Sequence, residues 1–196
     1  YLENLDGFER FQNLTSLKLR PCSQLNNLEN ITKLSNLIEL ELYSDKPESC
    51  STVYLASGTY VLTKLETLTI KNCSTIKNIV GMDRISSLKS VTLSFTSISN
   101  ISGLSNQVGL TTLVLNNNKI TDLSELDSLI TNVGGNLGFS ELDLYYNGIV
   151  LFSGAHENAN TIENLLNHGV NKITLYSGDE IASSSKLSGK SGVIIK

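Results

Sequence analysis

Hydrophobic residues recur along this chain in a fixed pattern. The clearest copy has Leu110, Leu113, Leu115, Asn118 and Ile120, which gives the spacing L-x-x-L-x-L-x-x-N-x-I. The L-x-L part alternates with period two, and this predicts a short strand whose leucines point to one side. The same template fits seven segments, which begin at positions 14, 37, 65, 88, 110, 139 and 170. The chain is therefore predicted to be an array of similar units, each packed on its neighbours.

A second periodicity follows the asparagine position of each unit. In the third repeat, Ile76, Ile79, Met82 and Ile85 recur at every third residue. A period of three suits 3-10 turns or extended backbone better than an α-helix. Stacked units of this kind predict a parallel β-sheet on the inner, concave face and 3-10 or short helical turns on the outer, convex face.

Three intervals are longer than the regular 22 or 23 residues. Residues 46–62 contain Pro, Gly and many hydroxyl residues, which predict a loop or a small hairpin. Residues 130–138 are rich in Gly and predict a second loop. Residues 161–168 have the pattern of a short amphipathic helix, with an N-cap at Asn160 or at the first residue of the segment and with Gly169 as the C-cap.

The two ends of the array depart from the template. Residues 1–13 carry hydrophobic residues at intervals of three, which predicts a partial repeat or an atypical cap. Residues 182–196 predict a polar tail, or a cap in which the final hydrophobic run 193–195 forms a last strand. An end unit exposes its hydrophobic face unless a cap covers it. We expect residues 1–196 to form a single repeat domain.

Charge and hydropathy exclude two classes of partner. The net charge is −4 with acids and bases interspersed, so no basic stripe is available to a nucleic acid. No hydrophobic run approaches the roughly 20 residues that a membrane helix needs. We expect a monomer without nucleic-acid binding or membrane insertion.

The cysteines do not indicate a disulfide framework or a zinc site. There are three of them, Cys22, Cys50 and Cys73, and none has C-x-x-C spacing. Cys22 and Cys73 take the asparagine position of their repeats, which predicts that both are buried.

The tandem L-x-x-L-x-x-L-x-L-x-x-N-x-I pattern, clearest in residues 76–129, resembles the short-repeat class of leucine-rich-repeat proteins. That class includes the internalin-like surface proteins of Gram-positive bacteria and the intracellular phosphatase-regulator type. Residues 118–129 are especially similar to internalins. The resemblance covers residues 1–181 and implies an α/β-type repeat solenoid, the leucine-rich-repeat horseshoe.

The asparagine position departs from the pattern of this class in most repeats. In the class, asparagines at this position form a side-chain ladder that ties neighbouring backbones together. We therefore expect a ladder that is only partly built, and a coil that is less regular in its first half. The seven positions hold Cys22, Asp45, Cys73, Thr96, Asn118, Asn147 and Gly178.

Few residues are suited to catalysis. His156 and His168 are the only histidines, neither has the spacing of a zinc-protease helix, and both are predicted to face solvent. The chain has no G-x-S-x-G motif, phosphate loop or dinucleotide fingerprint. The sequence predicts a protein that is not an enzyme and uses no cofactor or metal.

The residues that flank the inward leucines point onto the open concave sheet. No packing rule fixes their identity, so they are free to recognise a partner. Tyrosine and arginine dominate interface energetics, although exposed strand positions also favour tyrosine for its β-propensity. The candidate anchors are Arg20, Tyr43, Tyr145 and Tyr176, and the full candidate set is Arg20, Glu39, Glu41, Tyr43, Lys71, Asn116, Glu141, Asp143, Tyr145 and Tyr176.

The size and charge of this face indicate the kind of partner. The acidic residues Glu39, Glu41 and Asp143 favour a basic patch on the partner, or they keep the sheet soluble. With strands about 4.8 Å apart, Tyr43 and Tyr145 are expected to lie roughly 19 Å apart. That span suits a protein or a long glycan better than a metabolite.

These observations favour a non-catalytic recognition module, by resemblance an internalin-like protein that is secreted or held on a bacterial surface. The alternative is an intracellular scaffold or regulatory subunit, in which case the location is cytoplasmic. A third hypothesis is a spacer that has no partner of its own.

Overall fold

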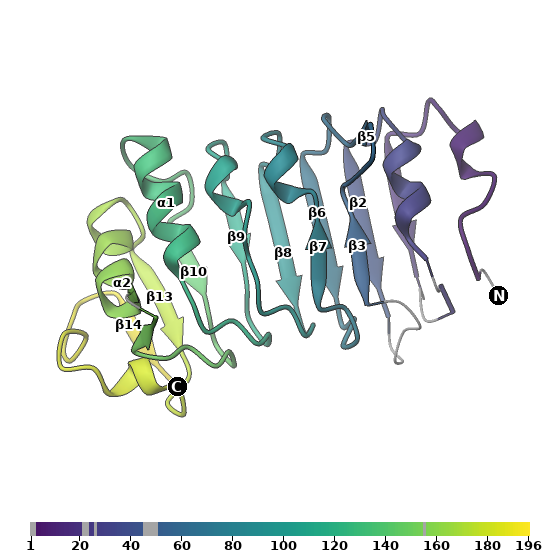
Figure 1. The fold of residues 1–196 in the computed structure, drawn as a ribbon. Coiled ribbons are helices and arrows are strands. Elements are labelled where there is room, and N and C mark those ends of the chain that lie inside the picture. Colours follow the sequence, from purple (N-terminus) through teal and green to yellow (C-terminus); the bar gives the residue numbers. More distant parts are fainter. Residues whose placement is uncertain (1–2, 21–23, 26, 45–50, 155) are drawn as a thin grey trace.

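The structure is a computed structural model, and it describes residues 3–20, 24–25, 27–44, 51–154 and 156–196. It shows a row of similar coils, with the two ends of the chain at opposite ends of the row (Figure 1). Three residues discussed above, Cys22, Asp45 and Cys50, lie outside the described residues.

One parallel sheet runs through all the coils. Its first seven strands coincide with the seven repeats, so the predicted α/β solenoid with a parallel sheet is confirmed. The strands, in their order across the sheet, are β1 (Ser16–Leu19), β2 (Glu39–Tyr43), β6 (Thr67–Lys71), β8 (Ser90–Ser94), β9 (Thr112–Val114), β10 (Glu141–Asp143), β13 (Lys172–Leu175) and β14 (Val193–Ile195).

The leucine positions of the template form a continuous core under the sheet. Leu68, Val91 and Leu113 lie opposite one another on three successive strands, and all three are buried. Their neighbours in the chain alternate to the other side of the sheet, away from this core. We call that other side the open face.

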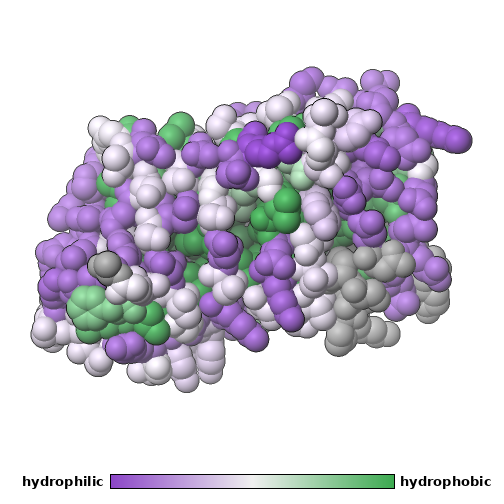
Figure 2. Space-filling view, viewed as in Figure 1, coloured by the Kyte–Doolittle hydropathy of each residue, from purple (hydrophilic) through white to green (hydrophobic). Residues whose placement is uncertain are grey.

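Short helices cover the opposite side of the core (Figure 1), as the period of three predicted. Figure 2 shows this side, where hydrophilic and neutral residues cover most of the surface and hydrophobic residues lie in patches between them. The 3-10 helices are η1 (Phe8–Arg10), η2 (Glu29–Lys33), η3 (Met82–Arg84), η4 (Leu104–Asn106) and η5 (Glu180–Ser183).

The loop predicted for residues 130–138 is wrong over its first four residues. They belong to α1 (Ser124–Val133), a ten-residue α-helix whose Leu126, Leu129 and Ile130 are buried. Gly134 caps this helix in the left-handed conformation at φ 66. The glycines therefore end a helix that begins ahead of them.

The helix predicted for residues 161–168 is confirmed, but it begins three residues earlier and is capped by other residues than expected. It is α2 (Asn158–Asn167), with Glu157 at the N-cap and His168 at the C-cap. Asn158 is fully buried, and its amide donates to the carbonyls of Thr121 (2.8 Å) and Val150 (2.7 Å). The start of α2 is thus fixed by contacts with the preceding coil.

The long interval after β2 contains the predicted hairpin, and a second small hairpin precedes α2. The first is formed by β4 (Ala56–Ser57) and β5 (Tyr60–Val61), and β3 (Thr52–Tyr54) before it pairs in parallel with β7 (Asn78–Val80). The second is formed by β11 (Phe152–Ser153) and β12 (His156–Glu157).

The asparagine ladder is present where asparagine occurs. The Asn118 amide donates to the carbonyls of Leu93 (2.8 Å) and Leu115 (3.0 Å), and the Asn147 amide donates to those of Leu115 and Leu144 (both 2.9 Å). Cys73 is buried, as predicted, and its thiol donates to the Lys71 carbonyl at 3.3 Å. The ladder positions of the first two repeats lie outside the described residues.

The two ends of the row are closed differently. At the N-terminal end, Leu5 is buried and η1 packs beside η2, as in the non-strand half of a repeat. At the C-terminal end, Leu187 is buried and β14 adds an eighth strand, parallel to β13. None of the helices among the described residues has the length and hydrophobicity needed to cross a membrane.

Candidate partner-binding surface

The strand register places six of the ten candidate residues on the open face, and the other four follow the ends of strands at its edge. The four are Arg20, Asn116, Tyr145 and Tyr176. Glu39, Glu41 and Tyr43 alternate along β2 with buried leucines, and Glu141 and Asp143 do the same along β10. Their side chains fall into two groups, one at each end of the sheet, with a polar stretch between them.

The N-terminal group is bound together by ion pairs. Lys18 Nζ lies 2.7 Å from Glu39 and 3.7 Å from Glu41, and the Arg20 guanidinium pairs with Glu41. The Arg20 guanidinium carbon is also 5.9 Å from the centre of the Tyr43 ring. The hydrogen bond from Lys18 is the main cause that lowers the pKa of Glu39. In this group, charges on the chain compensate one another.

The middle of the face is polar and less densely charged. Asn116 lies two residues after β9, and its side-chain oxygen Oδ1 accepts a hydrogen bond from Ser94 Oγ at 2.7 Å. Lys71 is exposed at the end of β6 and takes part in none of the salt bridges between described residues.

Three tyrosines meet at the C-terminal end of the face. The rings of Tyr146 and Tyr176 stack with centroids 4.4 Å apart, and the ring of Tyr145 stands edge-on to both at 4.6 and 5.6 Å. We call these residues the tyrosine cluster. Burial raises the pKa of Tyr145, and both neighbouring tyrosines raise it further. Its phenol therefore stays neutral at physiological pH.

Tyr146 is a candidate that sequence reasoning missed. It is 48% exposed and has a φ of 53, a left-handed backbone that is unusual for a large side chain. Asn72, Phe95 and Asn117 occupy the same position of the preceding repeats, also at positive φ. Asparagine tolerates this conformation, whereas Phe95 and Tyr146 are aromatic. The signal in the sequence was an aromatic residue at this position directly after Tyr145.

Gly178 is explained by this cluster. A Cβ atom at residue 178 would lie 2.3 Å from Cε1 of Tyr176, which is closer than real atoms approach. The departure from asparagine in the last repeat thus makes room for the Tyr176 ring, which stacks on Tyr146.

The two acids of β10 differ in their partners. Glu141 forms an ion pair with Lys172 at 2.6 Å. Asp143 accepts a hydrogen bond from the backbone of Tyr145 at 3.0 Å, but it takes part in none of the salt bridges found in the described part of the chain. A hollow of about 150 Å³ lies beside both acids, and Lys172 and Lys196 also line it.

The histidines lie elsewhere and are half-buried, which corrects the prediction that both face solvent. His156 Nε2 is 2.8 Å from Thr161 Oγ1 and 3.6 Å from an Asp127 oxygen, and Thr161 donates to the same carboxylate at 2.9 Å. His168 Nδ1 lies 2.7 Å from the Asn164 carbonyl. Through its bond to Asp127, the Thr161 hydroxyl joins α2 to α1. Because Thr161 is completely buried, this hydroxyl is not accessible to a substrate.

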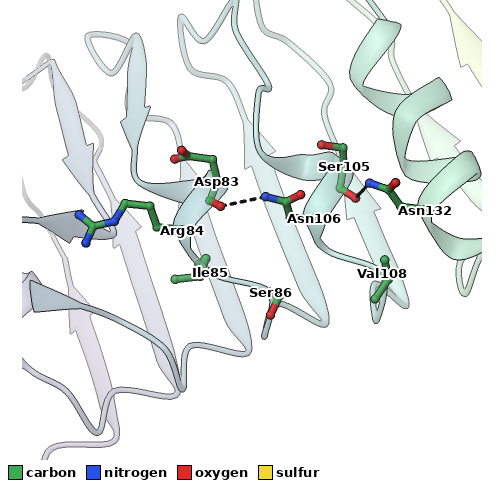
Figure 3. A pocket seen from close by; sticks show the side chains of 8 residues that line it. All are labelled: Asp83, Arg84, Ile85, Ser86, Ser105, Asn106, Val108 and Asn132. Atoms are coloured by element: carbon green, nitrogen blue, oxygen red, sulfur yellow. Dashed lines mark hydrogen bonds between the residues drawn. The ribbon is translucent and has the colours of Figure 1, made fainter.

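A larger hollow of about 450 Å³ lies on the side of the helices (Figure 3). Figure 3 shows that its two asparagines point at the neighbouring coil: Asn106 donates to the Asp83 carbonyl and Asn132 to the Ser105 carbonyl, both at 2.8 Å. These amides join successive coils. Among the described residues, no group of histidines, cysteines and acids is arranged to hold a metal ion.

Comparisons with known proteins agree with this architecture. Residues 86–128 match the model for leucine-rich repeats in two copies. The structure is similar to internalin C2 from Listeria monocytogenes, with a TM-score of 0.66 and 23% identity over 98% of this chain and 75% of that protein. The chain has the fold of a leucine-rich-repeat protein.

Two further leucine-rich-repeat structures are similar over shorter shares of their own length. An internalin, InlF, from Listeria monocytogenes has a TM-score of 0.50 and 18% identity over 96% of this chain and 58% of that protein. A leucine-rich-repeat protein from Leptospira interrogans has a TM-score of 0.55 and 18% identity over 89% of this chain and 48% of that protein. No curated protein sequence matches the chain.

The resemblance stated from the repeats is thus confirmed at the level of fold. Leucine-rich-repeat proteins generally mediate protein–protein interaction and are typically not catalytic. For this chain the comparisons show the fold, and the partner and its binding residues stay predictions.

Proposed function

We propose that this chain is a recognition module without catalytic activity, and that it binds a partner protein on the open face of the sheet, the concave face of the sequence prediction. The observation that carries the proposal is the tyrosine cluster. It gathers three aromatic side chains in mutual ring contact at one end of the face.

The cluster has the properties of an interface anchor. Tyrosine offers a large contact area with a polar end and loses little conformational entropy when it is bound. Tyr146 keeps 48% of its surface exposed and requires a left-handed backbone, which is unfavourable for an aromatic residue. Phe95 takes the same position and backbone conformation two repeats earlier, but Tyr146 also stacks on Tyr176, and that ring contact supports a role in binding.

The similarity to internalins favours a bacterial protein that is secreted or held on the cell surface, where it adheres to a partner. The alternative is an intracellular scaffold or regulatory subunit that uses the same face. A glycan is a second class of ligand that suits the length of the face. We expect the module to act as a monomer.

Affinity capture tests the proposal. The parent chain, Tyr146→Ala and the control Tyr60→Ala are immobilised and exposed to separate extracellular and cytosolic protein fractions. Tyr60 is a matched control, because it is 53% exposed but lies in β5, which packs against η2 on the side of the helices. We expect a partner retained by the parent and by Tyr60→Ala but lost from Tyr146→Ala, and the fraction that supplies it distinguishes the two locations.

A partner retained equally by all three chains would place the site outside the tyrosine cluster. Melting curves of the three chains provide the folding control, since both substitutions remove an exposed side chain and are expected to leave stability nearly unchanged.

A further inference from the structure

Two places on the open face carry the same arrangement of an acid and a tyrosine. On β2, Glu41 is followed two residues later by Tyr43, and on β10, Asp143 is followed two residues later by Tyr145. In both pairs the acid lies between two buried leucines, so it occupies the same position of its repeat.

In the N-terminal pair, the chain itself supplies a guanidinium. Arg20 follows the last residue of β1, and the register of β1 and β2 places it opposite Tyr43. Its guanidinium pairs with Glu41 and lies 5.9 Å from the centre of the Tyr43 ring. Lys18, opposite Glu41, adds a second positive charge at 3.7 Å.

In the C-terminal pair, the corresponding cations are missing. The register places Val114 opposite Asp143, where the first pair has lysine. Beyond the paired residues, the backbone bond from Asn117 to the Tyr145 carbonyl brings Asn116 opposite Tyr145, where the first pair has arginine. Asn116 is bonded to Ser94. Lys172 is held by Glu141 at 2.6 Å, and Lys196, which lines the same hollow as Asp143, forms no ion pair with a described residue.

We infer that Asp143 and the tyrosine cluster form a binding site for a guanidinium group, supplied by an arginine side chain of the partner protein. This inference rests on the proposed function and names the chemistry that the open face recognises. The carboxylate of Asp143 pairs with the guanidinium, as Glu41 does with Arg20, and the tyrosine rings offer faces on which it stacks.

Arginine suits this site better than lysine. A guanidinium is planar, stacks on aromatic faces and is more weakly hydrated than an ammonium group, so less hydration is lost when it is bound. The ring centroids of Tyr146 and Tyr176 are only 4.4 Å apart, so the guanidinium lies on the outer surface of the cluster and not between these rings. The same residue type fills the N-terminal pair of this chain.

Small probes test the chemistry without knowledge of the partner. The parent chain is titrated with the N-acetyl methylamides of arginine, lysine and citrulline, and the ring signals of the three clustered tyrosines are followed by NMR. Citrulline has the shape of arginine but no charge. We expect saturable shifts with the arginine compound, weaker shifts with the lysine compound and none with the citrulline compound.

Two substitutions identify the site. Asp143→Asn removes the charge and keeps the shape of the side chain, so it is expected to lower the affinity for the arginine compound about tenfold. Asn116→Arg rebuilds the N-terminal arrangement with an internal guanidinium and is expected to abolish binding. The control Ser128→Arg adds the same charge at an exposed position of α1, on the side of the helices, and is expected to leave binding unchanged. Equal melting temperatures of the variants show that each chain is folded.

The outcomes separate this inference from the proposed function. Equal shifts with arginine and citrulline, or an Asp143→Asn chain that binds as well as the parent, would overturn the guanidinium site. A protein partner that is lost with Tyr146→Ala but retained by Asp143→Asn and Asn116→Arg would also overturn it, while the proposed function would hold. If the arginine compound binds as expected but no protein depends on Tyr146, the guanidinium site stands and the proposed function fails.

Discussion

The two ends of the open face have similar residues, but they differ in whether the acidic side chain is free to pair with a partner protein. At the β1–β2 end, Glu41 is nearly buried beneath Lys18 and Arg20, so its charge is compensated by the chain itself. At the β10–β13 end, Asp143 forms no salt bridge with a described residue, and Tyr145, whose backbone donates to it, belongs to the tyrosine cluster. From the sequence alone, Glu41 and Asp143 are equally good candidates for binding a partner. Their neighbours on adjacent strands decide which carboxylate is available.

The largest expected effect on stability comes from substitution in the core, and a substitution on the open face beside it is expected to have almost none. Leu142 and Asp143 are neighbours on β10, but Leu142 is 1% exposed and packs in the core. Leu142→Ala is expected to lower the free energy of unfolding by about 2–5 kcal/mol, because it leaves a cavity. Asp143→Asn is expected to change that free energy by less than about 0.5 kcal/mol. Urea unfolding of both variants measures the contrast, and equal losses would show that the assignment of the faces is wrong.

The ladder gives the next largest effect. Asn118→Ala leaves the carbonyls of Leu93 and Leu115 without their side-chain donor in a buried position. We expect a loss of about 1–3 kcal/mol in the free energy of unfolding. Lys119→Ala, on the exposed neighbour, is the matched control. A loss no larger than that of the control would mean that water replaces the amide.

A buried acid near the tyrosine cluster makes stability depend on pH. Burial raises the pKa of Asp179 from 3.8 to about 6, and backbone hydrogen bonds from Tyr176 and Ile149 offset only part of this rise. Its Oδ2 has no hydrogen-bond partner among the described residues. The folded chain therefore holds this proton more tightly than the unfolded chain, and stability falls as the pH rises from about 4 to about 6.

Asp179→Asn removes this titration. The variant is expected to be more stable than the parent by on the order of 1–3 kcal/mol at about pH 8, and nearly equal to it at about pH 4. Thermal unfolding at both values measures the difference. A parent that gains stability between pH 4 and pH 6 through this residue would contradict the assignment.

The smallest expected effect on stability comes from the β1–β2 end of the face, where the chain's own cations pair with Glu41. Arg20 is mostly exposed, so Arg20→Ala is expected to cost only about 0.2–1 kcal/mol, and less at high salt. Arg10→Ala is the control, since Arg10 takes part in none of the salt bridges between described residues. Denaturation at low and high salt measures the difference between the two variants.

The repeats were predictable because their hydrophobic positions are local and periodic. The positions of Leu113 and Leu142 follow from a spacing of two and three residues, and the parallel sheet follows from stacking. Helix α1 was harder to predict, because Leu126 and Leu129 keep the spacing of three that also fits 3-10 turns. Only Ile130, four residues after Leu126, gives the spacing of an α-helix. The early start of α2 depends on bonds from Asn158 to the preceding coil, which a local pattern does not contain.

The pairing on the open face was not predictable for a similar reason. Whether Glu41 or Asp143 has a cation beside it depends on residues 21 or more positions away in the chain, and on the strand register. The role of Tyr146 depends on the left-handed turn at the end of its strand, which places the ring against Tyr176.

The central claim is that a partner protein binds over the tyrosine cluster, and photo-crosslinking tests it most directly. A photoreactive phenylalanine analogue replaces Tyr146 in one chain and Tyr60 in another, and each chain is irradiated in the fraction that contains the partner. The account predicts a cross-linked product from position 146 and none from position 60. A product from position 60 alone would contradict it.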